Sequence, residues 1–301
     1  MFSKLIVTSP NGGATVALRD GNKDVVCIDS FNATGLSFRD DLLVRALQPR
    51  YVVICHLGTG EHTFISGGGE SGARFGDVHD VLIESKGILL VSTETNAIDC
   101  FRFDGAPTWT MSYPGEHDSH HFNSLVRMNG KLLVSRFGNF TQSGAYRGNT
   151  RNAGYVEIVG ENAVAVSELS QPHSLVVDED RLLLANSEQF EVREYSGQFE
   201  LIRKKNLGGY TRGIFVRNDI VYVGISGNRK DLQAPKKASI VALDRASWEE
   251  VGRYDLYGVS EIYSILGFEE SRLFEAAVSC MKSASERLMH SGEVIWNSDR
   301  A

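Results

Sequence analysis

The 301-residue chain has few cysteines and prolines and no long hydrophobic run. Its four cysteines are widely spaced and form no CxxC motif, so a disulfide framework or a local zinc motif is not indicated and we expect buried thiols. No apolar segment approaches the roughly 20 residues needed to cross a bilayer. The opening stretch MFSKLIVTSPNGG is too weakly apolar before Pro10 to be the core of a signal peptide. These absences predict a cytoplasmic globular protein that does not contact a membrane.

Excess positive charge is also lacking. Lysine and arginine number 31 against 38 aspartates and glutamates, which gives a formal net charge of -7. A net-acidic chain is a poor match for the phosphate backbone, so we expect no nucleic-acid partner. The glycine-rich stretch ISGGGESGARFG (65–76) is not followed by a helix-forming segment that could present its amino end to a phosphate, so no nucleotide cofactor is expected.

What the chain does contain is an internal repeat. Six segments share a polar or hydroxyl-bearing first residue, a small or short second residue and an apolar third one, and they start 39 to 51 residues apart. They are TGLSF from Thr34, HDVLI from His79, NSLVR from Asn123, HSLVV from His173, RGIFV from Arg212 and YSILG from Tyr263. A repeat of this length with period-two alternation and turn signals such as MNG and RND is typical of β-propeller blades. The repeat predicts an all-β protein, a six-bladed β-propeller that forms a single domain over residues 1–301.

The two ends of the chain complete this count. The amino-terminal segments KLIVTSP, ATVALRD and DVVCIDS resemble three strands without a first strand, and the last repeat is a first strand without partners. We therefore expect the N- and C-terminal strands to share one blade and to close the ring. Apolar residues at helical spacing after Ser271 predict a C-terminal helix at about 271–290, packed on the propeller face opposite the predicted site.

The phrases HHFNSLV, QPHSLVV and YTRGIFV are similar to first-strand motifs of bacterial propeller proteins of unknown function. Nearly the whole chain resembles the group of six-bladed propellers that includes NHL-type, virginiamycin B lyase-like and gluconolactonase-like proteins. This resemblance implies a fold more strongly than an activity.

The repeat predicts a ring of polar side chains around the propeller axis. The first strand of every blade lines the central channel, so the residues that start the six copies should point toward one axis. Because side chains alternate along a strand, residues two places earlier should form a second layer. That layer contains Asn32, Asp77, His121, Gln171, Tyr210 and Glu261. We interpret the two layers as a ligand site, although polar groups in a water-filled channel can also serve only to satisfy hydrogen bonds.

Two kinds of chemistry fit this ring. A divalent metal such as Zn, Mn, Fe or Ca could be bound by His79, His121, His173 and Glu261, and the resemblance to propeller lyases implies histidine sets of this kind. Without a metal, His79 or His173 would act as general base, Tyr263 as acid or proton shuttle, and Arg212 as an anion clamp. Equally, Arg212 could have a structural role, in which it forms an ion pair with Glu261 or Asp77.

Two long segments, FGNFTQSGAYRGNTRNAG after Arg136 and SGNRKDLQAPKKAS after Ile225, should rim the same end of the propeller. Their basic residues could draw in an anionic ligand, or they could be solvated loops. The candidate substrate-binding residues are Asn123, Tyr210, Gln171, Arg136, Arg147 and Arg229.

These features lead to a functional hypothesis. We expect an intracellular enzyme that abstracts a proton from a small anionic molecule, such as a uronate-like or phosphorylated sugar, as a lyase or as an epimerase or isomerase, with a metal or Arg212 stabilising the developing enolate. A lactone hydrolase, implied by the gluconolactonase-like resemblance, is one alternative. The other is a non-catalytic binding or scaffold propeller that uses its rim to bind a protein partner.

Overall fold

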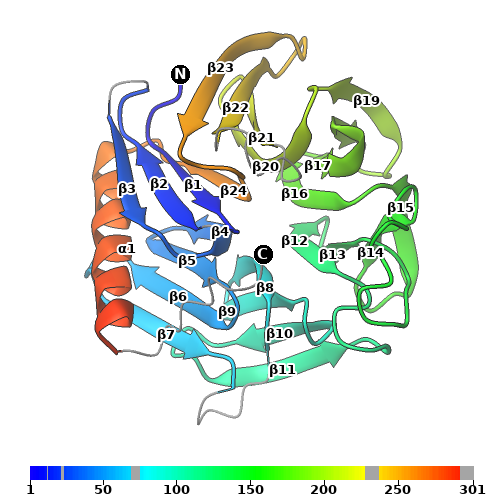
Figure 1. The fold of residues 1–301 in the computed structure, drawn as a ribbon, viewed down its shortest axis with the longest axis horizontal. Coiled ribbons are helices and arrows are strands. Elements are labelled where there is room, and N and C mark those ends of the chain that lie inside the picture. Colours follow the sequence, from blue (N-terminus) through cyan, green and yellow to red (C-terminus); the bar gives the residue numbers. More distant parts are fainter. Residues whose placement is uncertain (12, 22–23, 69–74, 228–236, 292–301) are drawn as a thin grey trace.

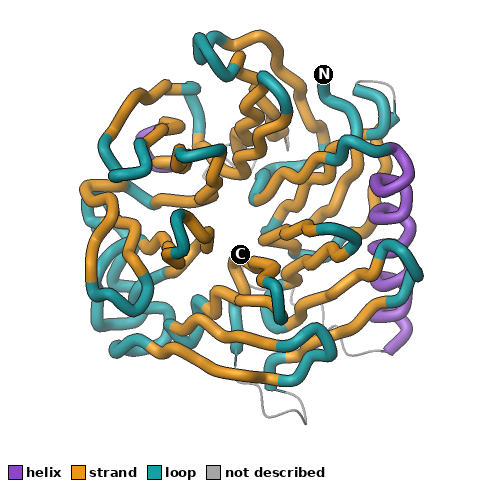
Figure 2. The backbone as a smooth tube through the Cα atoms, turned by 180° about the vertical axis from the view of Figure 1, so that it is seen from behind, coloured by secondary structure: helices purple, strands orange, loops and turns teal. Residues whose placement is uncertain are grey.

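The computed structural model of the protein describes residues 1–11, 13–21, 24–68, 75–227 and 237–291. Six four-stranded antiparallel sheets are arranged around a central axis (Figure 1). This arrangement confirms the predicted six-bladed β-propeller. A tube drawn from behind shows the same ring of strands, with loops at its outer edge and at both ends of the blades (Figure 2).

Every blade is built in the same way, with its first strand nearest the axis. From the axis outward, blade 1 contains β4 (Ala33–Arg39), β5 (Leu42–Leu47), β6 (Tyr51–His56) and β7 (His62–Ser66), and blade 2 contains β8 (Val78–Glu84), β9 (Gly87–Ser92), β10 (Ala97–Phe101) and β11 (Pro107–Ser112). Blade 3 contains β12 (Phe122–Met128), β13 (Lys131–Arg136), β14 (Gly154–Ile158) and β15 (Ala163–Leu169), and blade 4 contains β16 (Pro172–Asp178), β17 (Arg181–Asn186), β18 (Glu191–Tyr195) and β19 (Leu201–Asn206). Blade 5 contains β20 (Tyr210–Arg217), β21 (Ile220–Ser226), β22 (Lys237–Asp244) and β23 (Glu250–Tyr257), and blade 6 contains β24 (Ser264–Gly267), β1 (Leu5–Ser9), β2 (Ala14–Leu18) and β3 (Val25–Asp29). A short 3-10 helix, Ser187–Gln189, follows β17.

The sixth blade joins the two ends of the chain. Its inner strand β24 pairs with β1, with Ile265 opposite Val7 and Ser264 opposite Thr8. The predicted shared blade is therefore confirmed. The C-terminal inner strand thus pairs with the three N-terminal strands, so the ring closes and the inner strand of the last blade is not left unpaired.

The hydrophobic cores lie between adjacent blades. The second strands are buried on both faces, and β9 (GILLVS) has no exposed residue at all, because its two faces pack against different neighbouring sheets. One core, for example, combines Leu183 and Val192 of blade 4 with Val221, Val223 and Val241 of blade 5. Burying these apolar side chains between sheets is the main force that holds the blades together.

Short polar side chains also connect consecutive blades near the axis. In three blades the residue after the ring position accepts a hydrogen bond from a backbone N–H of the next blade. The pairs are Asp80 with Leu125 at 2.9 Å, Ser124 with Leu175 at 3.2 Å and Ser174 with Gly213 at 2.8 Å. In the first blade this position is Gly35, where a Cβ atom would lie 2.6 Å from the Cα of Asp80. The small second residue of the repeat is thus required by the closeness of neighbouring blades.

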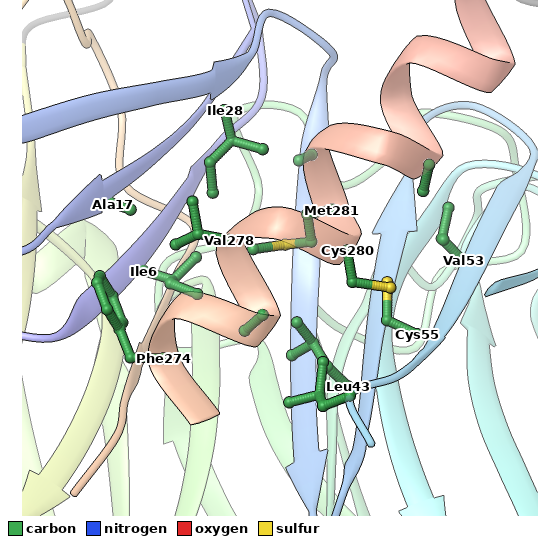
Figure 3. Packing of buried hydrophobic residues seen from close by; sticks show 14 of the residues in the cluster. Ile6, Ala17, Ile28, Leu43, Val53, Cys55, Phe274, Val278, Cys280 and Met281 are labelled. Carbon is green, nitrogen blue, oxygen red and sulfur yellow. The ribbon is translucent and has the colours of Figure 1, made fainter. Parts of the chain in front are cut away.

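The helix α1 (Ser271–Ser291) follows β24 and confirms the predicted C-terminal helix. Its placement differs from the prediction, because Figure 1 shows that it lies at the outer edge of the ring, beside β3 and β6, and not on the face opposite the ring residues. Its apolar face, including Phe274 and Met281, packs on residues of blades 1 and 6 (Figure 3). A helix with one such apolar stripe covers the junction where the ring closes.

A buried charged pair fixes this junction further. Arg45 of blade 1 donates to the carboxylate of Asp29 in blade 6 at 2.6 Å and to Ser285 of α1 at 2.9 Å. The Arg45 and Asp29 side chains are 0% and 3% exposed, so each charge depends on the other for stabilisation.

The cysteines only partly follow the expectation of buried thiols. Cys55 and Cys280 are buried, Cys100 is half-buried and Cys27 is exposed. Cys27 lies on the outermost strand of its blade, where one face of the sheet meets solvent. Among the described residues, no helix has both the length and the apolar character that a membrane span requires.

Candidate functional site

The structure brings the six predicted ring residues together at the start of the inner strands. Thr34, His79, Asn123, His173 and Arg212 lie within the first three residues of β4, β8, β12, β16 and β20, and Tyr263 directly precedes β24. All six are buried, with exposed fractions between 0% and 7%. His79, Arg212 and Tyr263 are 6 to 7% exposed, whereas the other three are exposed by 1% or less.

Irregular pairing shapes the backbone at this ring. In each of blades 1 to 5, the register between the inner strand and the second strand shifts at or beside the ring residue. The shifts lie between Ala33 and Leu36, Val78 and Asp80, Phe122 and Ser124, His173 and Val176, and Arg212 and Ile214. Bulges of this kind redirect side chains and are common beside functional sites.

The second layer differs from its predicted form. Asp77, His121 and Gln171 do not continue the inner strands, because each has a left-handed backbone with φ of 48°, 49° and 53°. The chain therefore turns just before each of these strands, where regular alternation was expected to extend. These three residues and Tyr210 are half-buried, whereas Glu261 is buried.

His79 lies in a polar chain that crosses two blades. Its Nε2 contacts the carboxylate of Asp77 at 3.2 Å and its Nδ1 contacts Oδ1 of Asn123 at 3.1 Å. Burial alone would lower the pKa of His79, but the Asp77 carboxylate and the Asn123 acceptor outweigh it and raise the pKa. Burial likewise opposes ionisation of Asp77, yet His79 brings the Asp77 pKa down to about 2. Both shifts favour a charged Asp77–His79 pair near neutral pH.

His173 has the opposite electrostatic character. Its Nδ1 lies 2.9 Å from the backbone oxygen of Gln171, which can only accept, so Nδ1 carries the proton and Nε2 presents a lone pair. This Nε2 is buried and has no hydrogen-bond partner in the described structure. Burial and the nearby Arg212 guanidinium lower the pKa of His173 well below its usual value. The imidazole is therefore neutral near pH 7, with one unsatisfied acceptor.

Arg212 lies next to His173 and shares its aromatic neighbours. Its guanidinium lies 5.0 Å from the ring centre of Tyr210 and 5.3 Å from that of Tyr263. One Nη donates to Glu261 at 2.9 Å, which confirms the ion-pair reading of this arginine. Burial alone would lower the pKa of Arg212, but Tyr210 and Glu261 keep it raised. Its Nε–H is buried without a partner in the described structure, so a donor and an acceptor are both left unsatisfied here.

Tyr263 stands between the two histidines. Its ring centre is 5.7 Å from that of His79 and 6.1 Å from that of His173. Its hydroxyl donates to the backbone oxygen of Asn123 at 3.3 Å. Burial raises the pKa of Tyr263 well above its usual value despite the nearby Arg212, so the phenol stays protonated. A histidine with a raised pKa and a histidine with a lowered pKa on either side of a phenol form an arrangement suited to acid–base chemistry.

The remaining ring residue, Thr34, is structural. Its hydroxyl donates to the backbone oxygen of Val78 in the next blade at 2.6 Å. The second-layer residue of the same blade, Asn32, is half-buried. Blade 1 therefore contributes mainly a connection to blade 2, while blades 2 to 6 contribute the titratable groups.

Asp80, directly after His79, was not predicted as a site residue. Its carboxylate accepts the backbone N–H groups of Val81 and Leu125, each at 2.9 Å. Burial outweighs these hydrogen bonds and raises the pKa of Asp80 to about 7.

The proposed metal ligands do not fit a metal ion in this arrangement. Both ring nitrogens of His79 contact Asp77 and Asn123, and one oxygen of Glu261 binds Arg212. His121 binds Asp118 through Nδ1 at 2.7 Å. Within the described ranges, no three histidine, cysteine, aspartate or glutamate side chains are grouped closely enough to hold a metal. We derive no step through a metal.

The candidate substrate-binding residues are distributed unevenly. Asn123 belongs to the ring, and the Tyr210 hydroxyl, at the start of the inner strand of blade 5, donates to the side chain of Gln171, directly before the inner strand of blade 4. Arg147 is exposed near the mouth, 5.8 Å above the ring of Tyr146. The prediction for Arg229 lies outside the described residues.

The structure places Arg136, a predicted substrate-binding residue, away from the ring. Its guanidinium pairs with Glu157 at 2.6 Å and lies 4.3 Å from the ring centre of Tyr155. Arg136 ends the second strand of blade 3, so its side chain enters the space between blades and does not face the axis. We therefore leave it out of the site.

Two aromatic residues of the long loop of blade 3, Phe137 and Tyr146, pack beside the ring and were not predicted from the sequence. The ring of His121 packs against both Phe137 and Tyr146, with centroid distances of 4.4 Å and 4.3 Å, and these two rings also contact each other. The hydroxyl of Tyr146 donates to Asp118 at 2.8 Å, and Asp118 also holds His121. The loop was expected to rim this end of the propeller. Its contacts with His121 depend on the conformation of an irregular segment, which no repeating sequence pattern indicates. The neighbouring His120 contacts the backbone oxygen of Pro114 at 2.7 Å.

Comparison with solved structures shows the fold. A protein of unknown function from Bacteroides caccae is 12% identical, with a TM-score of 0.64 over 88% of this chain and 98% of that chain. A luciferin-regenerating enzyme is 11% identical, with a TM-score of 0.53 over 74% and 76%. Regucalcin from Agrobacterium tumefaciens, described as a calcium-binding protein, is 12% identical, with a TM-score of 0.52 over 76% and 75%. Neighbours with this fold therefore include an enzyme.

Comparison with curated protein sequences finds no match. A family model described as a domain of unknown function, DUF4915, matches residues 74–266. That segment covers more than half of the chain and contains the inner strands of blades 2 to 5. The predicted membership of the six-bladed propeller group is confirmed, and the chain belongs to the DUF4915 family.

Proposed function

We propose that the protein is an enzyme that moves a proton on a small anionic molecule held in the ring. The observation that carries this proposal is the pair of unsatisfied atoms, Nε2 of His173 and Nε–H of Arg212. Buried polar atoms without partners are costly in a folded protein and are concentrated at ligand and catalytic sites. A ligand that gives a proton to His173 and an oxygen to Arg212 would satisfy both at once.

The proposed roles follow from the protonation states. Neutral His173 takes a proton from a carbon next to a carboxylate or carbonyl, and the electron pair moves to the oxygen of the resulting enolate. The N–H of Arg212 donates to that oxygen, and the Tyr263 hydroxyl turns from the backbone oxygen of Asn123 to donate to it as well. In a lyase, His79 turns its Nδ1–H from Asn123 to the group that leaves from the adjacent carbon and gives its proton to that group. In an epimerase or isomerase, it returns a proton to the substrate.

The proposed substrate class is a uronate-like or phosphorylated sugar. Such molecules have both an acidic C–H beside an oxygen-bearing group and a negative charge. Arg147 is exposed near the mouth and has no ion pair within the described part of the chain. A positive charge at the entrance would raise the local concentration of an anion.

Binding without turnover is the second candidate function. It is favoured by the pairing that already exists in the ring, since Arg212 contacts Glu261 and His79 contacts Asp77. In these ion pairs each charge of the ring is already balanced by a neighbouring side chain, so no charge of a substrate is needed to balance it.

The test is incorporation of deuterium. Purified protein is incubated in deuterated buffer with glucuronate, galacturonate and hexose phosphates, and exchange at the carbon beside the carboxylate or carbonyl is followed by NMR. Ultraviolet absorbance reports any unsaturated product of elimination. We expect exchange or elimination with at least one compound, and a loss of at least about 100-fold in His173→Gln.

His290→Gln is the matched control, because His290 is exposed at the end of α1. It should exchange at the wild-type rate. A ligand that binds the wild type, is lost in Arg212→Gln and shows no exchange would favour binding without turnover. Equal exchange in His173→Gln and wild type would contradict the role of His173.

A further inference from the structure

We propose that Cys55 and Cys280 form a peroxide-sensitive thiol pair whose oxidation to a disulfide links α1 covalently to blade 1. This inference is separate from the ring, because it concerns the outer junction where the propeller closes. It starts from the two sulfur atoms, which lie side by side between β6 and α1 (Figure 3). The two thiols are hydrogen-bonded to each other.

The two thiols are not equivalent. The hydrogen bond with Cys280, together with burial, raises the pKa of Cys55. The same bond and the nearby Arg45 guanidinium lower the pKa of Cys280. A thiolate is the nucleophilic form of cysteine, and a nearby cation favours it. Cys280 is therefore the attacking sulfur and Cys55 the resolving one.

A surface groove gives an oxidant access to Cys280. This groove has a volume of about 380 Å³ and lies between α1 and the turn after β6. Its lining consists of Leu57, Gly58, Thr59, Gly60, Ala276, Ser279, Cys280 and Ser283. The Cys280 sulfur also lies 3.7 Å from the backbone oxygen of Gly60. A small polar oxidant such as hydrogen peroxide can reach this sulfur, whereas Cys55 is 1% exposed and lies behind it.

The reaction balances with a peroxide as the oxidant. The Cys280 thiol attacks one peroxide oxygen, the O–O bond breaks, and water leaves to give a sulfenic acid. The Cys55 thiol then attacks the Cys280 sulfur, an S–S bond forms, and a second water leaves. His62, the cross-strand partner of Cys55, can accept the thiol proton. Burial lowers the pKa of His62 and keeps it neutral, and both its ring nitrogens lack partners in the described structure.

The consequence is a covalent bond across the closing junction. Cys55 belongs to blade 1, and α1 is the segment that follows the inner strand of blade 6. A disulfide would hold α1 on the ring when the noncovalent packing loosens, so the oxidised protein should unfold at a higher temperature.

The test uses full-length protein treated with hydrogen peroxide, then unfolded and alkylated with N-ethylmaleimide. We expect the wild type to fall from four alkylatable thiols to two, to yield a linked Cys55–Cys280 peptide in mass spectrometry, and to melt at a higher temperature until dithiothreitol is added. Cys27→Ser is the matched control, because Cys27 is the exposed cysteine, and it should still form the linked peptide.

Two further variants separate the roles of the sulfurs. In Cys55→Ser, the sulfenic acid should persist on Cys280 and be captured by dimedone. In Cys280→Ser, neither the linked peptide nor a dimedone adduct on Cys55 should form. The proposal is overturned if the wild type shows no linked peptide, or if peroxide modifies Cys27 while Cys55 and Cys280 stay reduced.

Discussion

Replacing Asp80 with serine should make the protein more stable at neutral and alkaline pH. Two later blades already have serine at the equivalent position, where Ser124 and Ser174 accept an N–H from the next blade. Asp80→Ser therefore keeps the acceptor for Leu125 and removes a half-buried carboxyl group. It loses the second hydrogen bond, from Val81, at a cost of about 1 kcal/mol that does not depend on pH.

The size of the effect follows from the pKa of Asp80, which burial raises from 3.8 to about 7. Between these values the unfolded chain has lost the proton and the folded chain keeps it, so the folded state becomes less stable as pH rises. A shift of about 3 units corresponds to ~4 kcal/mol in total. About 3 kcal/mol of this loss falls between pH 5 and pH 8.

The assay is urea unfolding followed by tryptophan fluorescence at several pH values from about 5 to about 8. The unfolding free energy of Asp80→Ser minus that of wild type should increase by about 3 kcal/mol across this range. Asp40→Ser is the control, because the Asp40 side chain is 86% exposed, and its difference from wild type should stay flat. A flat difference for Asp80→Ser would refute the assignment of a raised pKa to this carboxyl group.

Two further predictions concern the charged pairs. Asp77→Asn should lower the pKa of His79 below its usual value, because burial would no longer be opposed by the carboxylate; NMR titration of the histidine ring measures this, and an unchanged His79 pKa would contradict it. Asp29→Asn should destabilise the fold by about 3–5 kcal/mol in urea unfolding, since it leaves the buried charge of Arg45 unpaired. A loss below about 1 kcal/mol would show that Arg45 finds another partner.

The fold could be predicted from the sequence because the same requirement recurs in every blade. Residues such as Gly35 and Ser174 occupy a position where the neighbouring blade is too close for a larger group or needs an acceptor. That requirement leaves a pattern at a fixed spacing. The ring followed from it, since the position before each small residue lies at the same radius from the axis.

The details of the site could not be predicted because they depend on single contacts. Nothing periodic indicates that Tyr146 packs on His121, or that Asp118 binds both of them. The left-handed backbone at Gln171 breaks the alternation from which the second layer was inferred. Arg136 was predicted as a substrate-binding residue, although its position on the second strand of a blade directs it toward Glu157.

The most direct test of the account is the protonation state of His173. Protein labelled with ¹⁵N-histidine is compared with the His173→Gln variant by long-range ¹H–¹⁵N NMR between about pH 5 and about pH 8. The account predicts a neutral His173 with its proton on Nδ1 near pH 7, and an Nε2 resonance that shifts when a bound uronate or sugar phosphate reaches the ring. A His173 that is protonated near pH 7, or that carries its proton on Nε2, would contradict the central claim.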